Sequence, residues 1–182
     1  MSSWDRNIDF MHYIRLFRTI LQTRYYRGRK LTNKQTCGTL VLYIQLRNGS
    51  RISEALECYN KFRESKKLEH RISVRKSKKH KDRLMIIDLP PHIVNKLHAI
   101  CLNIQLNEAY LKQLAQRTYH INTHSLRYAF IKYLDKMNVS PTMIAHITKH
   151  SNLNHILTYT RKSSAEDILR YLLSGVRDYD NI

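Results

Sequence analysis

Apolar residues recur at three- and four-residue steps over much of the chain, which is the period of an amphipathic helix. One stripe runs through residues 4–21, and another fills residues 32–47 and stops at Gly49. Glycine commonly ends a helix because it accepts a left-handed backbone. Ser50 then stands where a cap would start a short new helix. The first third of the chain is therefore predicted to be helical.

The pattern changes over residues 57–88, where helical periodicity fades and charge rises. Apolar residues on two arms, at 72–74 and 84–87, predict a β-hairpin joined by a polar turn at 76–82. Residues 103–121 are polar and predict no definite element. Helical stripes return after the hairpin, at residues 93–100, 126–134, 144–147 and 164–173. The expected fold is mainly α with a small antiparallel β-sheet (α+β).

Composition narrows the class of protein. A chain of 182 residues suits one domain. With only 4 Gly and 3 Pro, a turn-rich sandwich or barrel and a glycine-rich phosphate loop are both unlikely. No run of about 18 apolar residues would span a membrane, and the N-terminus lacks the apolar stretch of a signal peptide. We therefore expect an intracellular protein of the cytoplasm or nucleoid, with no membrane partner.

The charge balance points to a polyanionic partner. Lys and Arg number 32 against 14 Asp and Glu, which gives a net charge of +18. A compact domain with this charge repels itself unless a phosphate backbone neutralises it. Nucleic acid is the favoured partner, and a generally basic, solvated surface is the alternative. The basic stretch of residues 24–30, which includes Tyr25 and Tyr26, resembles a connector that could lie along phosphates.

The three cysteines, Cys37, Cys58 and Cys101, lie far apart in the sequence. An odd count without close pairs argues against a disulfide scaffold and against a cysteine-based zinc site. A reducing intracellular compartment is the simplest interpretation.

Four separated features carry candidate chemistry. Arg51 lies in Gly49-Ser50-Arg51-Ile52-Ser53-Glu54, and Lys78 lies in the predicted hairpin turn. His124 and Arg127 form a His-x-x-Arg motif, in which residues three apart share a helix face. His150-Ser151 is followed, nine residues after the histidine, by Tyr159.

This order resembles the catalytic domain of the tyrosine recombinases, also called the phage-integrase family, over residues 32–161. The resemblance implies the fold of that catalytic domain. It also implies a reaction that cleaves DNA through a 3′-phosphotyrosyl link and uses no ATP, metal or other cofactor. One position departs from the family pattern, because Lys149 stands where a glycine usually precedes the histidine.

The resemblance also assigns roles. Tyr159 would be the nucleophile, and the remaining residues would assist it. Two arginines suit the extra negative charge of a five-coordinate phosphorane, because the guanidinium is planar and permanently cationic. A tyrosine with a pKa of about 10 needs a base and a cationic field to attack at neutral pH. The predicted helpers are Arg51 and Arg127 on the non-bridging oxygens, His124 as proton acceptor or orienting group, Lys78 as acid for the 5′-oxygen and His150 as hydrogen-bond donor.

Some alternatives stay open. Lys76 is the next candidate for the catalytic lysine. Lys78 is preferred because Lys81-Asp82-Arg83, three residues after it, matches the family's Lys-x-Arg stretch. Among twelve tyrosines only Tyr159 has the required spacing. A type IB-like topoisomerase and a non-catalytic, basic DNA-binding relative are the competing functions.

The predicted organisation is a single catalytic domain over residues 1–182. It comprises an N-terminal helix and basic connector (1–31), a catalytic core (32–161) and a C-terminal helix and tail (162–182). Family members usually carry a helical DNA-clamping domain first, and about 30 residues before Thr32 are too few for one, so we expect the clamp to be absent.

The expected partners are double-stranded DNA and further copies of the chain, up to a tetramer. The apolar stripe at 168–173 would pack either in cis or on a neighbouring copy. The expected source is a virus or another mobile element.

Overall fold

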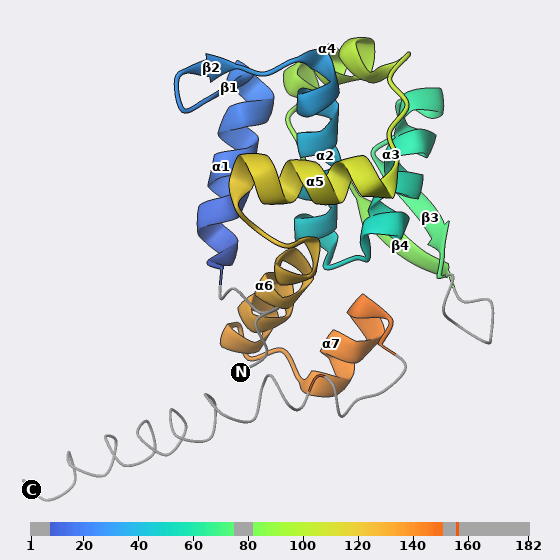
Figure 1. Ribbon diagram of the computed structural model, residues 1–182. Coiled ribbons are helices and arrows are strands. Elements are labelled where there is room, and N and C mark those ends of the chain that lie inside the picture. Colours follow the sequence, from blue (N-terminus) through green and yellow to red (C-terminus); the bar gives the residue numbers. More distant parts are fainter. Residues whose placement is uncertain (1–7, 75–81, 151–155, 157–182) are drawn as a thin grey trace, which may run out of the picture. The chain divides into compact units, whose positions relative to one another are not determined.

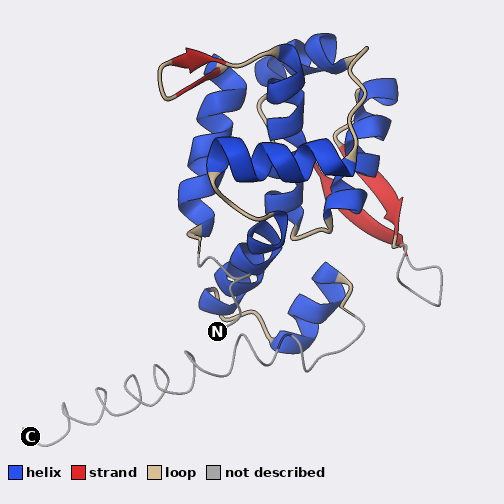
Figure 2. Ribbon diagram, in the orientation of Figure 1, coloured by secondary structure: helices blue, strands red, loops and turns tan. Residues whose placement is uncertain are grey.

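The computed structural model describes residues 8–74, 82–150 and 156 (Figures 1 and 2). It is mainly helical with a small antiparallel β component, as predicted, and that component comprises two hairpins where one was expected. The chain divides into two compact units, Met1–Tyr133 and Leu134–Ile182. None of the described helices is long and apolar enough to cross a membrane. In chain order the elements are α1 (Phe10–Thr23), β1 (Tyr25–Tyr26), β2 (Arg29–Lys30), α2 (Asn33–Asn48), α3 (Ile52–Ser65), β3 (Glu69–Ser73), β4 (Asp82–Ile86), α4 (Pro91–Cys101), α5 (Glu108–Tyr119), α6 (Thr123–Lys136) and α7 (Pro141–Thr148).

Helix α2 is the centre of the first unit. Every residue from Thr36 to Leu46 is buried, which fits a sequence with no charged face. Helices α1, α3, α4 and α5 all pack against it, and α5 crosses it in Figure 1. Gly38 permits this crossing, because a Cβ there would collide with Leu114 and approach Tyr110 of α5 at 3.2 Å.

Helix α2 covers nearly the predicted range and ends at Gly49 as predicted. Thr32 caps the first turn, since its hydroxyl accepts from the Gln35 N–H at 3.2 Å while the Gln35 side chain accepts from the Thr32 N–H at 2.9 Å. Gly49 ends the helix with a left-handed φ of +56°. Helix α7 begins at Pro141 with Ser140 as its cap, the start that a Ser-Pro pair in the sequence favours.

Two helices differ from the sequence-based expectation. Helix α3 is 14 residues long rather than short, and its cap residue is Arg51 instead of Ser50. Its charged residues obscured a buried stripe of Ala55, Cys58, Tyr59 and Phe62. Helix α5 lies within residues 103–121, for which no element was predicted. A buried apolar stripe of Leu111, Leu114 and Ala115 packs it against the core.

The predicted hairpin is present as β3 and β4. The strands are antiparallel, with Arg71 opposite Leu84, and residues 75–81 of the connection lie outside the described residues. The alternation along β4 buries Arg83 and Met85 and leaves Leu84 and Ile86 on the outer face.

The basic connector is a second, smaller hairpin, formed by β1 and β2. Arg27 and Gly28 both have positive φ, as a tight two-residue hairpin turn requires. Tyr26 anchors the hairpin, because its ring contacts that of Tyr119 edge-on with centroids 5.2 Å apart. Arg27, Arg29 and Lys30 therefore project from an ordered support.

The prediction of unlinked cysteines is wrong for two of the three. Cys37 in α2 and Cys101 at the end of α4 form a disulfide, whereas Cys58 is a free, buried thiol. The partners lie 64 residues apart in the sequence. Helix packing brings them together, and spacing along the sequence does not reveal it.

Reducing this disulfide is expected to lower the free energy of unfolding by about 4 kcal/mol, because a loop of this length gains much freedom in the unfolded chain. Urea unfolding with and without reductant measures the difference. A Cys37→Ala/Cys101→Ala variant should unfold at the midpoint of the reduced protein in both conditions. Equal midpoints for the oxidised and reduced native protein would contradict the expectation.

Candidate active site

The corner between α2 and α3 organises the site. Gly49 turns the chain with its left-handed backbone, and the ring of Phe130 lies where a side chain at residue 49 would be. Arg51 follows in an extended conformation (φ −74°, ψ 156°) and becomes the cap of α3. Its side chain is 27% exposed, so it stands at the edge between the interior and solvent.

Arg127 reaches the same corner from α6. Its guanidinium is buried, and Nη1 donates to the Gly49 carbonyl oxygen at 2.7 Å. Burial, followed by the nearby charge of Arg51, lowers the pKa of Arg127 to about 10, so the group remains cationic at neutral pH. The structure therefore brings the two predicted arginines, which lie 76 residues apart in the sequence, to one corner.

 

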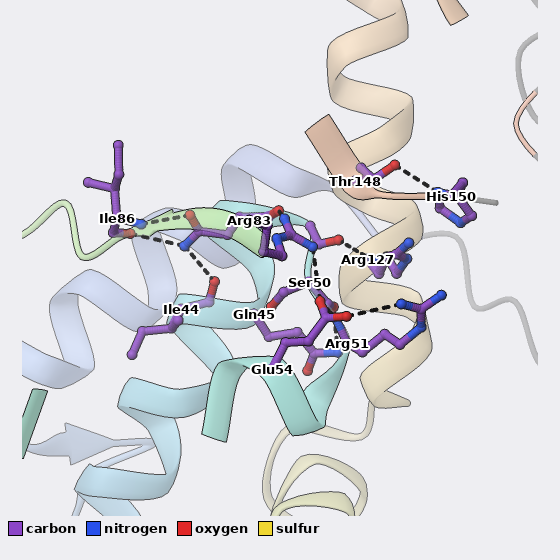
Figure 3. A network of polar contacts seen from close by, with 12 residues as sticks. Ile44, Gln45, Ser50, Arg51, Glu54, Arg83, Ile86, Arg127, Thr148 and His150 are labelled. Carbon is purple, nitrogen blue, oxygen red and sulfur yellow. Dashed lines mark hydrogen bonds and ion pairs between the residues drawn. The ribbon is translucent and has the colours of Figure 1, made fainter. Parts of the chain in front are cut away.

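Glu54 joins Arg51 to a third arginine, Arg83. Its buried carboxylate accepts from Arg51 Nη1 at 3.0 Å through Oε1, and from Arg83 Nη1 at 3.0 Å through Oε2 (Figure 3). The same Oε2 accepts from the Arg51 backbone N–H at 3.1 Å. Glu54 and Arg83 were not among the residues predicted from the sequence. The available signal for Glu54 was its position three residues after the helix cap, where a glutamate commonly bonds back to the cap.

Positive charge exceeds negative charge among the described residues of this corner. Arg51, Arg83 and Arg127 carry three positive charges there, and Glu54 is the carboxylate paired with Arg51 and Arg83. Burial also lowers the pKa of Arg83, which the Glu54 carboxylate opposes. Bringing an anion to this corner would relieve the repulsion between the guanidinium groups. The arrangement is therefore suited to hold a phosphate group.

Gln45 connects the corner to the start of α6. Its side-chain Nε2 donates to the Thr123 carbonyl at 2.9 Å and to the Ser50 carbonyl at 3.3 Å. Both bonds are buried, so the segments that carry Arg51 and Arg127 are fastened to one amide. The Gln45 amide therefore fixes the position of the Arg51 segment relative to the Arg127 segment.

His124 is the second residue of α6 and its side chain is exposed. Its backbone N–H donates to the Asn122 side chain at 2.9 Å, which fixes the first turn of the helix. Arg127 follows three residues later, so the two side chains leave neighbouring positions of α6.

His150 belongs to the second unit and follows the end of α7. Its Nδ1 lies 2.7 Å from the Thr148 hydroxyl, which itself donates to the Ile144 carbonyl at 2.6 Å. Lys149 has φ 55° and ψ 44°, so it adopts the left-handed conformation that a glycine would take most easily.

Two of the predicted residues lie outside the described residues. They are Lys78, together with its alternative Lys76, and the nucleophile candidate Tyr159. Their roles stay predictions from the sequence.

The comparisons with known proteins agree with the fold. No family model matches the sequence. The chain is 34% identical over 177 residues to "Putative integrase ORF241" of Acidianus two-tailed virus, covering 93% of this chain and 69% of that protein. It is 28% identical to "Putative integrase V10" of Sputnik virophage, covering 91% of this chain and 88% of that protein.

Among solved structures, the chain matches the XerH site-specific recombinase bound to a palindromic difH substrate, in a post-cleavage complex. The TM-score is 0.61 at 18% identity, over 88% of this chain. The chain spans half the length of that recombinase.

The fold is that of the tyrosine recombinases, and the arginine corner lies within it. The chain belongs to the tyrosine recombinase, or integrase, family.

Proposed function

We propose that the chain is the catalytic domain of a site-specific recombinase, an integrase that cuts and rejoins double-stranded DNA through Tyr159. The observation that carries this proposal is the corner where Arg51 and Arg127 meet around the Gly49 turn. Two guanidinium groups held together by the fold, with one carboxylate between three arginines, form a site for a charged phosphate. Membership of the integrase family supports the same conclusion.

In the proposed reaction the Tyr159 hydroxyl oxygen attacks the scissile phosphorus. The new P–O bond to the tyrosine forms as the bond to the 5′-oxygen breaks. His124 accepts the tyrosyl proton, and Lys78 gives a proton to the departing 5′-oxygen. Arg51 and Arg127 stabilise the charge that develops on the non-bridging oxygens, and His150 donates a further hydrogen bond to one of them.

Rejoining is the same reaction in reverse, with a 5′-hydroxyl as the nucleophile. The phosphotyrosyl ester conserves the energy of the broken phosphodiester, so we propose that neither ATP nor a metal ion takes part. Exchange between two DNA sites needs several active sites, and we propose that copies of the chain, up to four, assemble on DNA inside the host cell. The proposed contact between them is the apolar stripe at residues 168–173.

The proposed function is tested with a library of nicked DNA duplexes whose interior sequence is randomised. The nick lets the short 5′-hydroxyl fragment diffuse away, so a covalent intermediate accumulates. The native protein should form an adduct that survives denaturation, in EDTA and without ATP, and the trapped duplexes should share a sequence. No adduct, or an adduct that requires Mg²⁺, would overturn the proposal. Adducts spread evenly over all sequences would favour topoisomerase activity.

The hairpin β1–β2 is expected to contact the DNA backbone. Replacing Arg29 and Lys30 by alanine should weaken DNA binding and reduce the dependence of log K on log salt by about 2, because two phosphate contacts are lost. Fluorescence anisotropy over a salt series measures both effects. The matched control replaces Lys66 and Lys67, two exposed cations at the end of α3. An equal change in both variants would mean that only overall charge matters.

A further inference from the structure

Arg83 occupies an unusual place for an arginine. It lies on the buried face of strand β4, the same face as Met85, and its side chain is 2% exposed. Arginine is almost never fully buried unless it is paired. Nη1 donates to Glu54 Oε2 at 3.0 Å, and Nη2 donates to the Asn48 carbonyl. One guanidinium thus joins the strand to α3 and to the end of α2 (Figure 3).

Asn48 strengthens the same connection from the other side. Its side-chain oxygen accepts from the Ile86 N–H at 2.9 Å, and its side-chain nitrogen donates to the Ile86 carbonyl at 2.9 Å. Strand β4 is therefore fastened to the corner at Arg83 and again at Ile86. The hairpin whose connection contains Lys78 in the sequence shares this support with Arg51.

We propose that Arg83 is a positioning residue that keeps Arg51 available for the phosphate. Glu54 has two oxygens, and Arg83 engages one of them while Arg51 engages the other. With Arg83 present, the trio of Arg51, Arg83 and Glu54 keeps one net positive charge. Without it, the buried carboxylate would turn both oxygens to Arg51 and cancel its charge. This inference rests on the proposed function.

The kinetic test is single-turnover cleavage of the duplex selected from the nicked library, at saturating protein. An Arg83→Met variant should be slower by on the order of 100-fold, because a displaced catalytic group loses its alignment. Combining it with Arg51→Lys should slow cleavage little beyond Arg51→Lys alone, since both changes disable the same group. Penalties that multiply in full would overturn the proposal.

A second variant separates charge from folding. Arg83→Met/Glu54→Gln removes the buried carboxylate together with its partner, so no unpaired charge is left inside. It should cleave faster than Arg83→Met, because the amide takes no charge from Arg51. Arg63→Met is the control for lost arginine packing, since Arg63 donates to the carbonyls of Cys101 and Leu102, away from the corner. It should retain the native cleavage rate at a temperature where it is folded.

A measurement without DNA tests the positioning step by itself. In the native protein the Arg51 side-chain Nε–H should be ordered by NMR relaxation, and its signal should move in Arg83→Met but not in Arg63→Met. An unchanged Arg51 signal in Arg83→Met would overturn the proposal even if cleavage slowed. If the native protein forms no adduct, the proposed function fails, and the NMR result still decides whether Arg83 positions Arg51.

Discussion

The Tyr159→Phe variant is expected to bind the selected duplex like the native protein and to form no covalent adduct. Phenylalanine keeps the ring and removes the oxygen that would join the phosphorus. No other side chain replaces a nucleophile that is bonded to the DNA in the intermediate. The measurement is adduct formation on the nicked duplex, followed on a denaturing gel, with binding measured in parallel.

Tyr128→Phe is the matched control for this experiment. Tyr128 is adjacent to Arg127 in α6, so it is a tyrosine close to the site in sequence, but it lacks the spacing from His150. The control should form the adduct at a rate near that of the native protein. An adduct that persists in Tyr159→Phe and disappears in Tyr128→Phe would reassign the nucleophile.

Replacing Arg127 by lysine is expected to slow cleavage by about 10²- to 10³-fold, the usual effect of removing one donor to a developing oxyanion. The Arg127 guanidinium is a planar fork with several N–H donors, and Nη1 holds it to the Gly49 carbonyl. A lysine ammonium is a single point and does not reproduce that fork. Single-turnover cleavage at saturating protein measures the loss separately from binding.

Arg117→Lys serves as the control for a general arginine-to-lysine effect, because Arg117 is an exposed residue of α5. It should leave the cleavage rate unchanged. If Arg127→Lys also cleaved at the native rate, the assignment of the corner as the phosphate site would be wrong.

The sequence predicted the parts of the fold that depend on local chemistry. The start of α7 at Ser140 and the stop of α2 at Gly49 follow from a side chain that bonds to nearby backbone and from a residue that accepts a left-handed conformation. The stripe in α3 was missed because charged residues interrupt it, and the disulfide was missed because tertiary packing alone brings Cys37 to Cys101.

The sequence likewise predicted the site residues that belong to local motifs and missed those that only tertiary packing brings together. Arg51 and Arg127 belong to short motifs, whereas Glu54 and Arg83 are defined by an ion pair across 29 residues of sequence. On β4 the apolar Leu84 and Ile86 are exposed, and the alternation of the strand places Arg83 inside. Only the paired carboxylate makes that burial favourable, and the pairing depends on the fold.

The central claim is that Tyr159 becomes bonded to a DNA 3′-phosphate. The most direct measurement is to digest the trapped adduct with protease and nuclease and to locate the nucleotide by tandem mass spectrometry. The predicted result is a 3′-linked nucleotide on the peptide that contains Tyr159, with a free 5′-hydroxyl on the released strand. A nucleotide on another residue, or one attached through its 5′-phosphate, would contradict the account.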